Sequence, residues 1–221
     1  MRQRDEIRGA GFERSLMKTT RSNINTLCRR FRGLLPVVID VETSGLNSGT
    51  DALLEIAAVT LSMNSEGKLY RERTYSYHVE AFEGARLEKE ALEITGIDPT
   101  HPFRFALPER QVLYRLFDII RAELDRTQCY RAVLVGHNAW FDLSFILSSV
   151  KRSGIEYNPF HTFTTIDTAS LSAVALQETV LARALKRARI PFDIQKAHSA
   201  IYDAEATADL FCHITNLFPK R

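Results

Sequence analysis

Two acidic residues, Asp40 and Glu42, stand at the end of an apolar run that begins at Leu34. Alternate side chains of a strand point to the same side, so these two carboxylates would face the same way, with their Cα atoms about 6.6 Å apart. Burying ionised carboxylates is costly and like charges repel. The pair therefore favours a hard divalent cation and phosphate chemistry. Two solvated carboxylates at a strand end are the simpler alternative.

Three further polar residues extend this pattern along the chain. Asp142 falls in the first turns of a predicted helix, on the same apolar face as Phe145 and Ile146. Its alternative role is to accept backbone hydrogen bonds at the helix start, which the helix dipole also favours. His198 lies in a predicted loop five residues before Asp203. Histidine is the usual general base near neutral pH, although a lone loop histidine is more often a polar surface residue.

The elements that must position these residues alternate in type. Hydrophobic periodicity and turn residues predict strands at 36–42, 53–63, 69–80, 132–136 and 164–167. They predict helices at 87–95, 108–126, 139–152, 168–176, 179–189 and 200–218, with another short helix beginning at Ser22. Asn138 is expected to cap the helix at 139–152, and Asp167 the helix that follows it. A three-stranded meander followed by alternating helices and strands predicts an α/β mixed sheet flanked by helices.

Composition narrows the class of protein. The 221 residues, 45% hydrophobic and 25% charged, fit one domain over residues 21–221, preceded by a basic extension over 1–20 that we expect to be disordered. No apolar run approaches the ~18 residues of a membrane span, which argues against a membrane partner. The three scattered cysteines are typical of reduced thiols in a cytoplasmic protein.

Positive charge is concentrated near the N-terminus. Residues 1–32 hold nine Arg and Lys against three acids. Such a cluster can hold phosphates electrostatically, although a solvated charged surface is the commoner reason for one.

Taken in order, the chain has Asp-x-Glu at a strand end, an Asp at a helix start, then a His and a final Asp. This combination resembles the DEDD-type 3′→5′ exonucleases of the histidine subgroup. Longer stretches, at 36–43, 51–58, 96–99, 158–161 and 197–200, resemble the ribonuclease T family. The similarity covers about residues 22–218. It implies a ribonuclease H-like mixed five-stranded sheet, antiparallel in its meander and parallel in its later strands.

The resemblance also implies a mechanism. Two Mg²⁺ ions, which Mn²⁺ can replace, would be held by four acids, Asp40, Glu42, Asp142 and Asp203. His198 would take a proton from the attacking water. The enzyme would trim the 3′ ends of tRNA and other stable RNAs, and of single-stranded DNA, and release nucleoside 5′-monophosphates.

Substrate contacts follow from the same resemblance. The positions that surround the terminal nucleotides in the family are here Leu46, Glu90, Ile94, Phe141 and Phe163. At two of them, Leu46 and Ile94, the family has phenylalanine, so this chain lacks an aromatic face there and its base preference stays open. Core packing is the alternative role for Phe141 and Phe163, and a loop anchor is the alternative for Leu46.

The family is homodimeric, and basic residues of one subunit help to feed RNA to the other. Arg30, Arg32 and Arg131 match such positions, whereas Asp125 replaces a family lysine. A DNA proofreading exonuclease would share all five catalytic residues and is the alternative enzyme. A non-catalytic binding module predicts the loss of at least one of the five, and none is lost.

Overall fold

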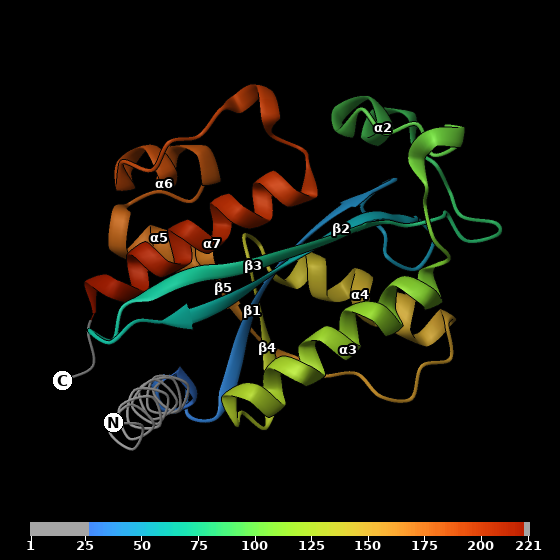
Figure 1. The fold of residues 1–221 in the computed structure, drawn as a ribbon. Helices are drawn as coiled ribbons and strands as arrows, with labels where there is room; N and C mark the ends of the chain where they lie inside the picture. The colour runs from blue at the N-terminus through green and yellow to red at the C-terminus, as the bar shows by residue number, and fades with distance from the viewer. Residues whose placement is uncertain (1–26, 219–221) are drawn as a thin grey trace, which may run out of the picture.

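The computed structural model describes residues 27–218 of the chain and builds them around one five-stranded sheet (Figure 1). The strand order is β3-β2-β1-β4-β5. The strands are β1 (Leu34–Thr43), β2 (Leu53–Met63), β3 (Leu69–His78), β4 (Arg131–Gly136) and β5 (Phe160–Asp167). The β1–β2 and β2–β3 pairs are antiparallel, and the β1–β4 and β4–β5 pairs are parallel. The predicted mixed sheet is therefore confirmed.

Helices lie on both sides of this sheet (Figure 1). They are α2 (Lys89–Thr95), α3 (Glu109–Thr127), α4 (Trp140–Arg152), α5 (Thr168–Leu176), α6 (Leu181–Ala188) and α7 (Ala200–Leu217), with short 3₁₀ turns η1 (Pro102–Arg104) and η2 (Ile194–Lys196). Helix α7 packs against the meander, while α3 and α4 contact β1 and β4. None of the described helices is long and apolar enough to cross a bilayer.

Strand β1 lies at the centre of the sheet and of the core. Its residues from Leu35 to Ile39 are fully buried, because both faces of a central strand are covered. This accounts for the unbroken apolar run that precedes Asp40. The first polar side chains therefore appear where the strand leaves the core.

Two strand boundaries differ from the sequence-based predictions, and the predictions for the N-terminal residues are covered by the structure only in part. The basic extension and the predicted cap at Ser22 lie outside the described residues, and residues 27–30 are helical. Strand β3 ends at His78, two residues early, because a bridge pairs Val79 with Leu107 instead. Strand β5 begins at Phe160 rather than at 164, because an edge strand whose residues 162–164 are exposed shows no alternation of burial to predict it.

The prediction that Asn138 caps α4 is wrong, because Asn138 does not have the extended backbone of an N-cap residue. The residue before α4 is Ala139, and no side chain caps the helix. Asn138 adopts a left-handed conformation, with φ of 67°, and its backbone N–H donates to Asp167 Oδ1 at 2.8 Å. The same carboxylate accepts the backbone N–H groups of Ala169 and Ser170, so the predicted cap of α5 is confirmed.

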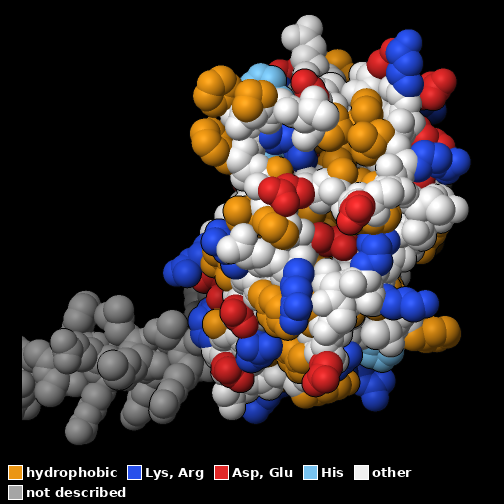
Figure 2. All heavy atoms as spheres, turned by 90° about the vertical axis from the view of Figure 1, so that its right-hand side faces the viewer, with side chains coloured by type: hydrophobic (Ala, Val, Ile, Leu, Met, Phe, Trp, Pro, Cys, Tyr) orange, Lys and Arg blue, Asp and Glu red, His pale blue; other side chains and the backbone are white. Residues whose placement is uncertain are grey.

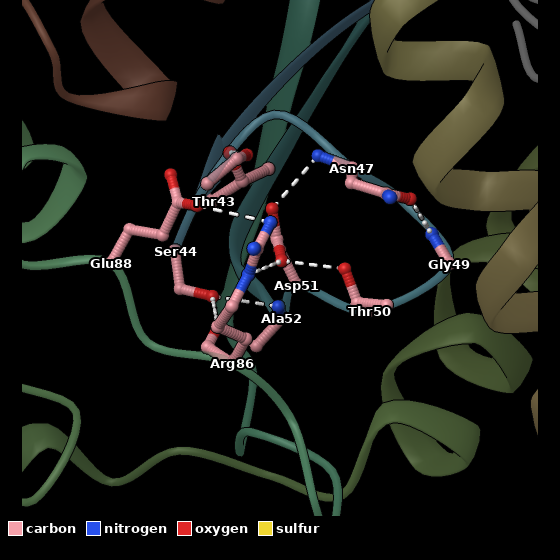
Figure 3. Close-up of polar contacts among 10 residues, drawn as sticks. Thr43, Ser44, Asn47, Gly49, Thr50, Asp51, Ala52, Arg86 and Glu88 are labelled. Carbon is pink, nitrogen blue, oxygen red and sulfur yellow. Dashed lines mark hydrogen bonds and ion pairs between the residues drawn. The ribbon is translucent and has the colours of Figure 1, made fainter.

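The loop that joins β1 to β2, residues 44–52, is hydrogen-bonded to the segment that precedes α2 (Figure 3). Asp51, which is fully buried, accepts the backbone N–H of Asn47 at 2.8 Å and Nε–H of Arg86 at 3.0 Å. Ser44 Oγ donates to the backbone carbonyl of Arg86 at 2.6 Å. Gly45 is required at its position, because a Cβ there would collide with the Asp51 carboxylate. The loop and the segment that leads into α2 are thus held as one unit.

We expect Asp51→Asn to lower the free energy of unfolding by about 1–3 kcal/mol, measured by urea denaturation near pH 7. Burial alone would raise the pKa of Asp51, but hydrogen bonds from Asn47, Arg86 and Thr50 outweigh it and hold the pKa below its usual value. This stabilisation is therefore present near neutral pH and is lost as the pH falls through the folded-state pKa.

Glu88→Gln is the matched control, since it removes only a partly exposed partner of Arg86 and should cost about 0–1 kcal/mol. Equal losses in the two variants would contradict the anchoring role of Asp51.

Candidate active site

Asp40 and Glu42 lie where β1 extends beyond its parallel neighbour. The register of β1 with β4 ends at Val38, whereas pairing with β2 continues to Thr43. The last residues of β1 therefore have one free edge. Asp40 is partly buried and Glu42 is 7% exposed, so these carboxylates are not a simple solvated pair.

Helix α4 places Asp142 against this free edge. The side chain is buried, and its Oδ1 accepts the backbone N–H of Val41 at 3.1 Å. Gly136 at the end of β4 makes room for it, because a Cβ there would lie 3.0 Å from Asp142 Oδ2. The two interpretations of Asp142 from the sequence thus meet in one geometry: it binds a backbone donor, and it lies close enough to Asp40 to raise the pKa of that residue.

The start of α7 supplies the other two residues. Asp203 accepts the backbone N–H of His198 at 2.8 Å, and His198 has a left-handed φ of 65°. One ligand atom from each of Glu42, His198 and Asp203 lies within 4.8 Å of the others. The structure therefore brings together the strand carboxylates and the helix residues that the sequence separates by about 160 positions.

The electrostatics of this cluster are unfavourable for ionised carboxylates. Burial, and then the charges of Asp142, Glu42 and Asp203, raise the pKa of Asp40 well above its usual value. Burial, followed by Asp203 and Glu55, raises the pKa of Glu42 to about 8. Burial also raises the pKa of Asp142 and of Asp203. The four acids hold more negative charge than this environment accommodates by itself.

A cation fits this donor set. Asp203 Oδ1 is buried and has no hydrogen-bond partner in the described part of the chain. The other oxygen of the same carboxylate holds the His198 backbone. Clustered carboxylate oxygens are the ligands that hard divalent cations prefer, and a bound cation would relieve the repulsion among them.

Glu55 is a neighbour of the site that sequence reasoning missed. It pairs with Glu42 across the β1–β2 hairpin and contributes to the raised pKa of that residue. Its Oε1 lies 2.9 Å from Nδ1 of His78. The predicted antiparallel meander could have indicated this contact, because residues that face each other across antiparallel strands lie side by side.

The predicted substrate-binding residues differ in their exposure. Leu46 is 81% exposed, Ile94 62% and Phe163 91%, so core packing does not account for Phe163 and Leu46 is no buried loop anchor. Glu90 is also exposed. Phe141 is partly buried, with its ring centroid 5.0 Å from that of Phe145, so core packing does account for part of its position.

Trp140 is a second residue that sequence reasoning left unassigned. It is 67% exposed, and its ring lies edge-on to Phe141 with the centroids 5.9 Å apart. Its place directly before Phe141 was the available signal.

The predicted RNA-backbone arginines have structural surroundings of their own. The guanidinium group of Arg30 donates to the backbone carbonyls of Thr215 and Phe218, near the end of α7. That of Arg131 donates to the carbonyl of Phe160 at 2.7 Å. Arg32 is exposed in a left-handed conformation. Contact of these three residues with RNA stays a prediction.

The family model RNase_T, described as an exonuclease, matches residues 37–211 of this chain. Ribonuclease T of Hahella chejuensis is 56% identical over 190 residues, which cover 86% of this chain and 87% of that protein. Ribonuclease T of Baumannia cicadellinicola is 53% identical over 200 residues, which cover 90% of this chain and 92% of that protein.

Solved structures share the fold at low sequence identity. The nuclease domain of 3'hExo, a DEDDh family member bound to rAMP, aligns with a TM-score of 0.66 and 19% identity, over 83% of this chain and 92% of that one. E. coli exonuclease I in complex with a dT13 oligonucleotide aligns with a TM-score of 0.63 and 18% identity, over 84% of this chain. The match spans only 42% of the exonuclease I chain.

The raised carboxyl pKa values predict how the stability of the metal-free protein depends on pH. Between about pH 4.5 and pH 8 the folded state keeps a proton on Glu42 that the unfolded state releases. The free energy of unfolding in EDTA should therefore fall as the pH rises through this window. Glu42→Gln should flatten the slope and be the more stable protein at pH 8, as urea denaturation across the window would show.

Glu66→Gln, at an exposed ion pair with Lys68, is the control and should leave the slope as in the wild type. A Glu42→Gln protein with the wild-type slope would refute the assignment of this proton.

Proposed function

The chain belongs to the ribonuclease T family of 3′→5′ exoribonucleases, and on that premise we propose that it trims the 3′ ends of tRNA and other stable RNAs by a two-metal mechanism. The observation that carries this proposal is the convergence of Glu42, His198 and Asp203 within 4.8 Å at the end of β1. A strand acid, a helix acid and a histidine in one place match what phosphodiester hydrolysis requires.

Asp40, Glu42, Asp142 and Asp203 would hold two Mg²⁺ ions, or Mn²⁺ in their place. When bound, such ions stabilise the attacking and leaving oxygens of an in-line displacement. The raised pKa values of these acids and the unpartnered oxygen of Asp203 support the assignment.

His198 is the proposed general base. Its side chain is exposed, so it can accept a proton from the attacking water and pass it to solvent. The hydrogen bond from its backbone to Asp203 ties the position of the ring to that of a proposed metal ligand. The product would be a nucleoside 5′-monophosphate.

Recognition of the 3′ end would rest on stacking, because unpaired bases offer their faces to apolar and aromatic side chains. The exposure of Leu46, Ile94 and Phe163 supports such contacts, and Glu90 lies on the same short helix as Ile94. A surface of this kind would also accept single-stranded DNA. In a homodimer, the basic side chains of one subunit would help to guide RNA to the active site of the other; the candidates are Arg30, Arg32 and Arg131.

We expect EDTA to abolish the release of mononucleotides from a single-stranded RNA, and added Mg²⁺ to restore it. Asp40→Asn should lower kcat roughly a hundredfold or more with Mg²⁺ present, because it removes a shared carboxylate ligand. Asp118→Asn, at an exposed ion pair on α3, should keep wild-type kcat. If EDTA-treated protein and Asp40→Asn both matched the untreated wild type, the two-metal mechanism would be wrong.

His198→Ala should lower kcat by about 10²–10⁴-fold while the Kd for RNA stays close to that of the wild type, because only proton transfer is lost. His213→Ala provides the control, since it lies ten residues beyond Asp203 on the same helix, roughly 15 Å along the axis. Wild-type kcat in His198→Ala would remove this residue from the role of base.

A tRNA with a 3′ overhang should be trimmed in preference to the mismatched 3′ end of a DNA primer. The ratio of kcat/KM values for these two substrates measures the preference. A ratio that favours the primer would support the proofreading alternative instead.

A further inference from the structure

An exposed aromatic cluster lies on the loop that follows α2. His101, Phe103 and Phe105 are alternate residues of the stretch 101–105 around the η1 turn, and Phe103 and Phe105 are 74% and 79% exposed. The ring centroids of His101 and Phe103 are 5.9 Å apart, and those of Phe103 and Phe105 are 6.5 Å apart. The face drawn in Figure 2 shows hydrophobic side chains that protrude at one edge, with a histidine beside them. Packing of the fold does not account for this cluster, and exposed apolar groups of this kind mark binding surfaces.

The backbone beneath these rings is firmly anchored. The Arg104 guanidinium donates to the carbonyl of Val79 at 3.0 Å and to that of Leu54, which ties the loop to the ends of β2 and β3. Leu107 then donates its N–H to the carbonyl of His78 at 3.0 Å. Phe105 is held at a φ of 50°, a conformation that bulky residues adopt only where the surroundings impose it. The rings are therefore presented on a fixed surface.

Part of the cluster shares a cleft with a residue of the proposed active site. This cleft, of about 400 Å³, is lined by His101, Phe103 and Arg104 on the loop and by His198 just before α7. Glu55, which faces Glu42 across the β1–β2 hairpin, lines the same cleft. A strand that passes His198 would therefore meet Phe103 within this cleft.

We propose that Phe103 and Phe105 form a stacking platform for an unpaired base of the same substrate strand whose 3′ end lies in the active site. The proposal rests on the exonuclease function proposed above. Nucleic acid is the occupant favoured here because Phe103 of the platform lines the same cleft as His198, the proposed general base. Ile94 on the preceding helix offers an apolar surface without an aromatic face, and the loop adds the rings that base stacking requires.

The test asks whether the loss of the two rings and the loss of one particular base affect KM independently. A single-stranded RNA is prepared intact and with one abasic residue placed in turn at each position from the 3′ end. KM and kcat for release of the first nucleotide are measured for the wild type and for Phe103→Ala/Phe105→Ala. For intact RNA the double variant should raise KM about tenfold and leave kcat unchanged, because one stacking contact is lost.

The decisive readout is non-additivity. At the position that stacks on the platform, removing the base should raise KM for the wild type and have little further effect in the double variant. Phe103→Leu/Phe105→Leu should behave like the alanine variant, because it keeps apolar bulk without aromatic rings. Tyr70→Ala is the matched control, an exposed aromatic eight residues before His78 on β3 and roughly 26 Å along the strand from it, and it should give wild-type values.

The outcomes separate the alternatives. Coupling at one or two positions supports the platform, and its absence at every position, with normal release by the wild type, overturns the platform alone. An unchanged KM together with an altered oligomeric state in sedimentation would assign the rings to a protein contact and also overturn it. A wild type that releases no nucleotides would overturn the proposed function and the platform with it.

Discussion

Repulsion among the carboxylates at the end of β1 is the constraint around which this protein is organised. Asp40, Glu42, Asp142 and Asp203 come from three separate elements, and each has a pKa raised by burial. Such a cluster opposes folding when its members ionise, so the remainder of the domain must stabilise it. The fully buried centre of β1 and the helices on both sides of the sheet meet this requirement. A bound cation would convert the same repulsion into affinity for metal.

The topology explains why the cluster forms at this place. Pairing of β1 with its parallel neighbour β4 ends at Val38, which leaves backbone groups at the end of β1 without a strand partner. The Asp142 carboxylate accepts one of these groups, the N–H of Val41. The antiparallel partner brings Glu55 opposite Glu42. The last helix begins beside the same strand end, where Asp203 fixes the His198 backbone. At the end of β1 the site therefore has β2 on one side, no paired strand on the other, and the start of α7 nearby.

Local patterns in the sequence were sufficient for much of this architecture. Asp40 and Glu42 were recognisable because an unbroken apolar run ends in two alternating acids, and the helices have clear periodicity. What the sequence did not reveal depends on tertiary contacts. Asn138 is a residue type that often caps helices, but its backbone is left-handed, with its N–H donated to Asp167, and its side chain does not cap α4. The first residues of β5 form an exposed edge strand without alternating burial, so no pattern predicts them. The position of the aromatic loop after α2 beside His198 is visible only in the folded structure, where both line one cleft.

The division between chemistry and recognition follows from these contacts. In the proposed mechanism the carboxylates and His198 would act on a phosphate, which is the same at every 3′ end, so they could not distinguish one RNA from another. Discrimination must come from the side chains around the bases. The exposed side chains proposed for such contacts are aliphatic at Leu46 and Ile94, and the exposed rings are those of Trp140, Phe103 and Phe163. Stacking is tolerant of base identity, whereas an aliphatic contact rewards shape and bulk. On this proposal, selectivity among RNA ends would depend on which base meets a ring and which meets an aliphatic side chain, while the reaction at the carboxylates would stay the same.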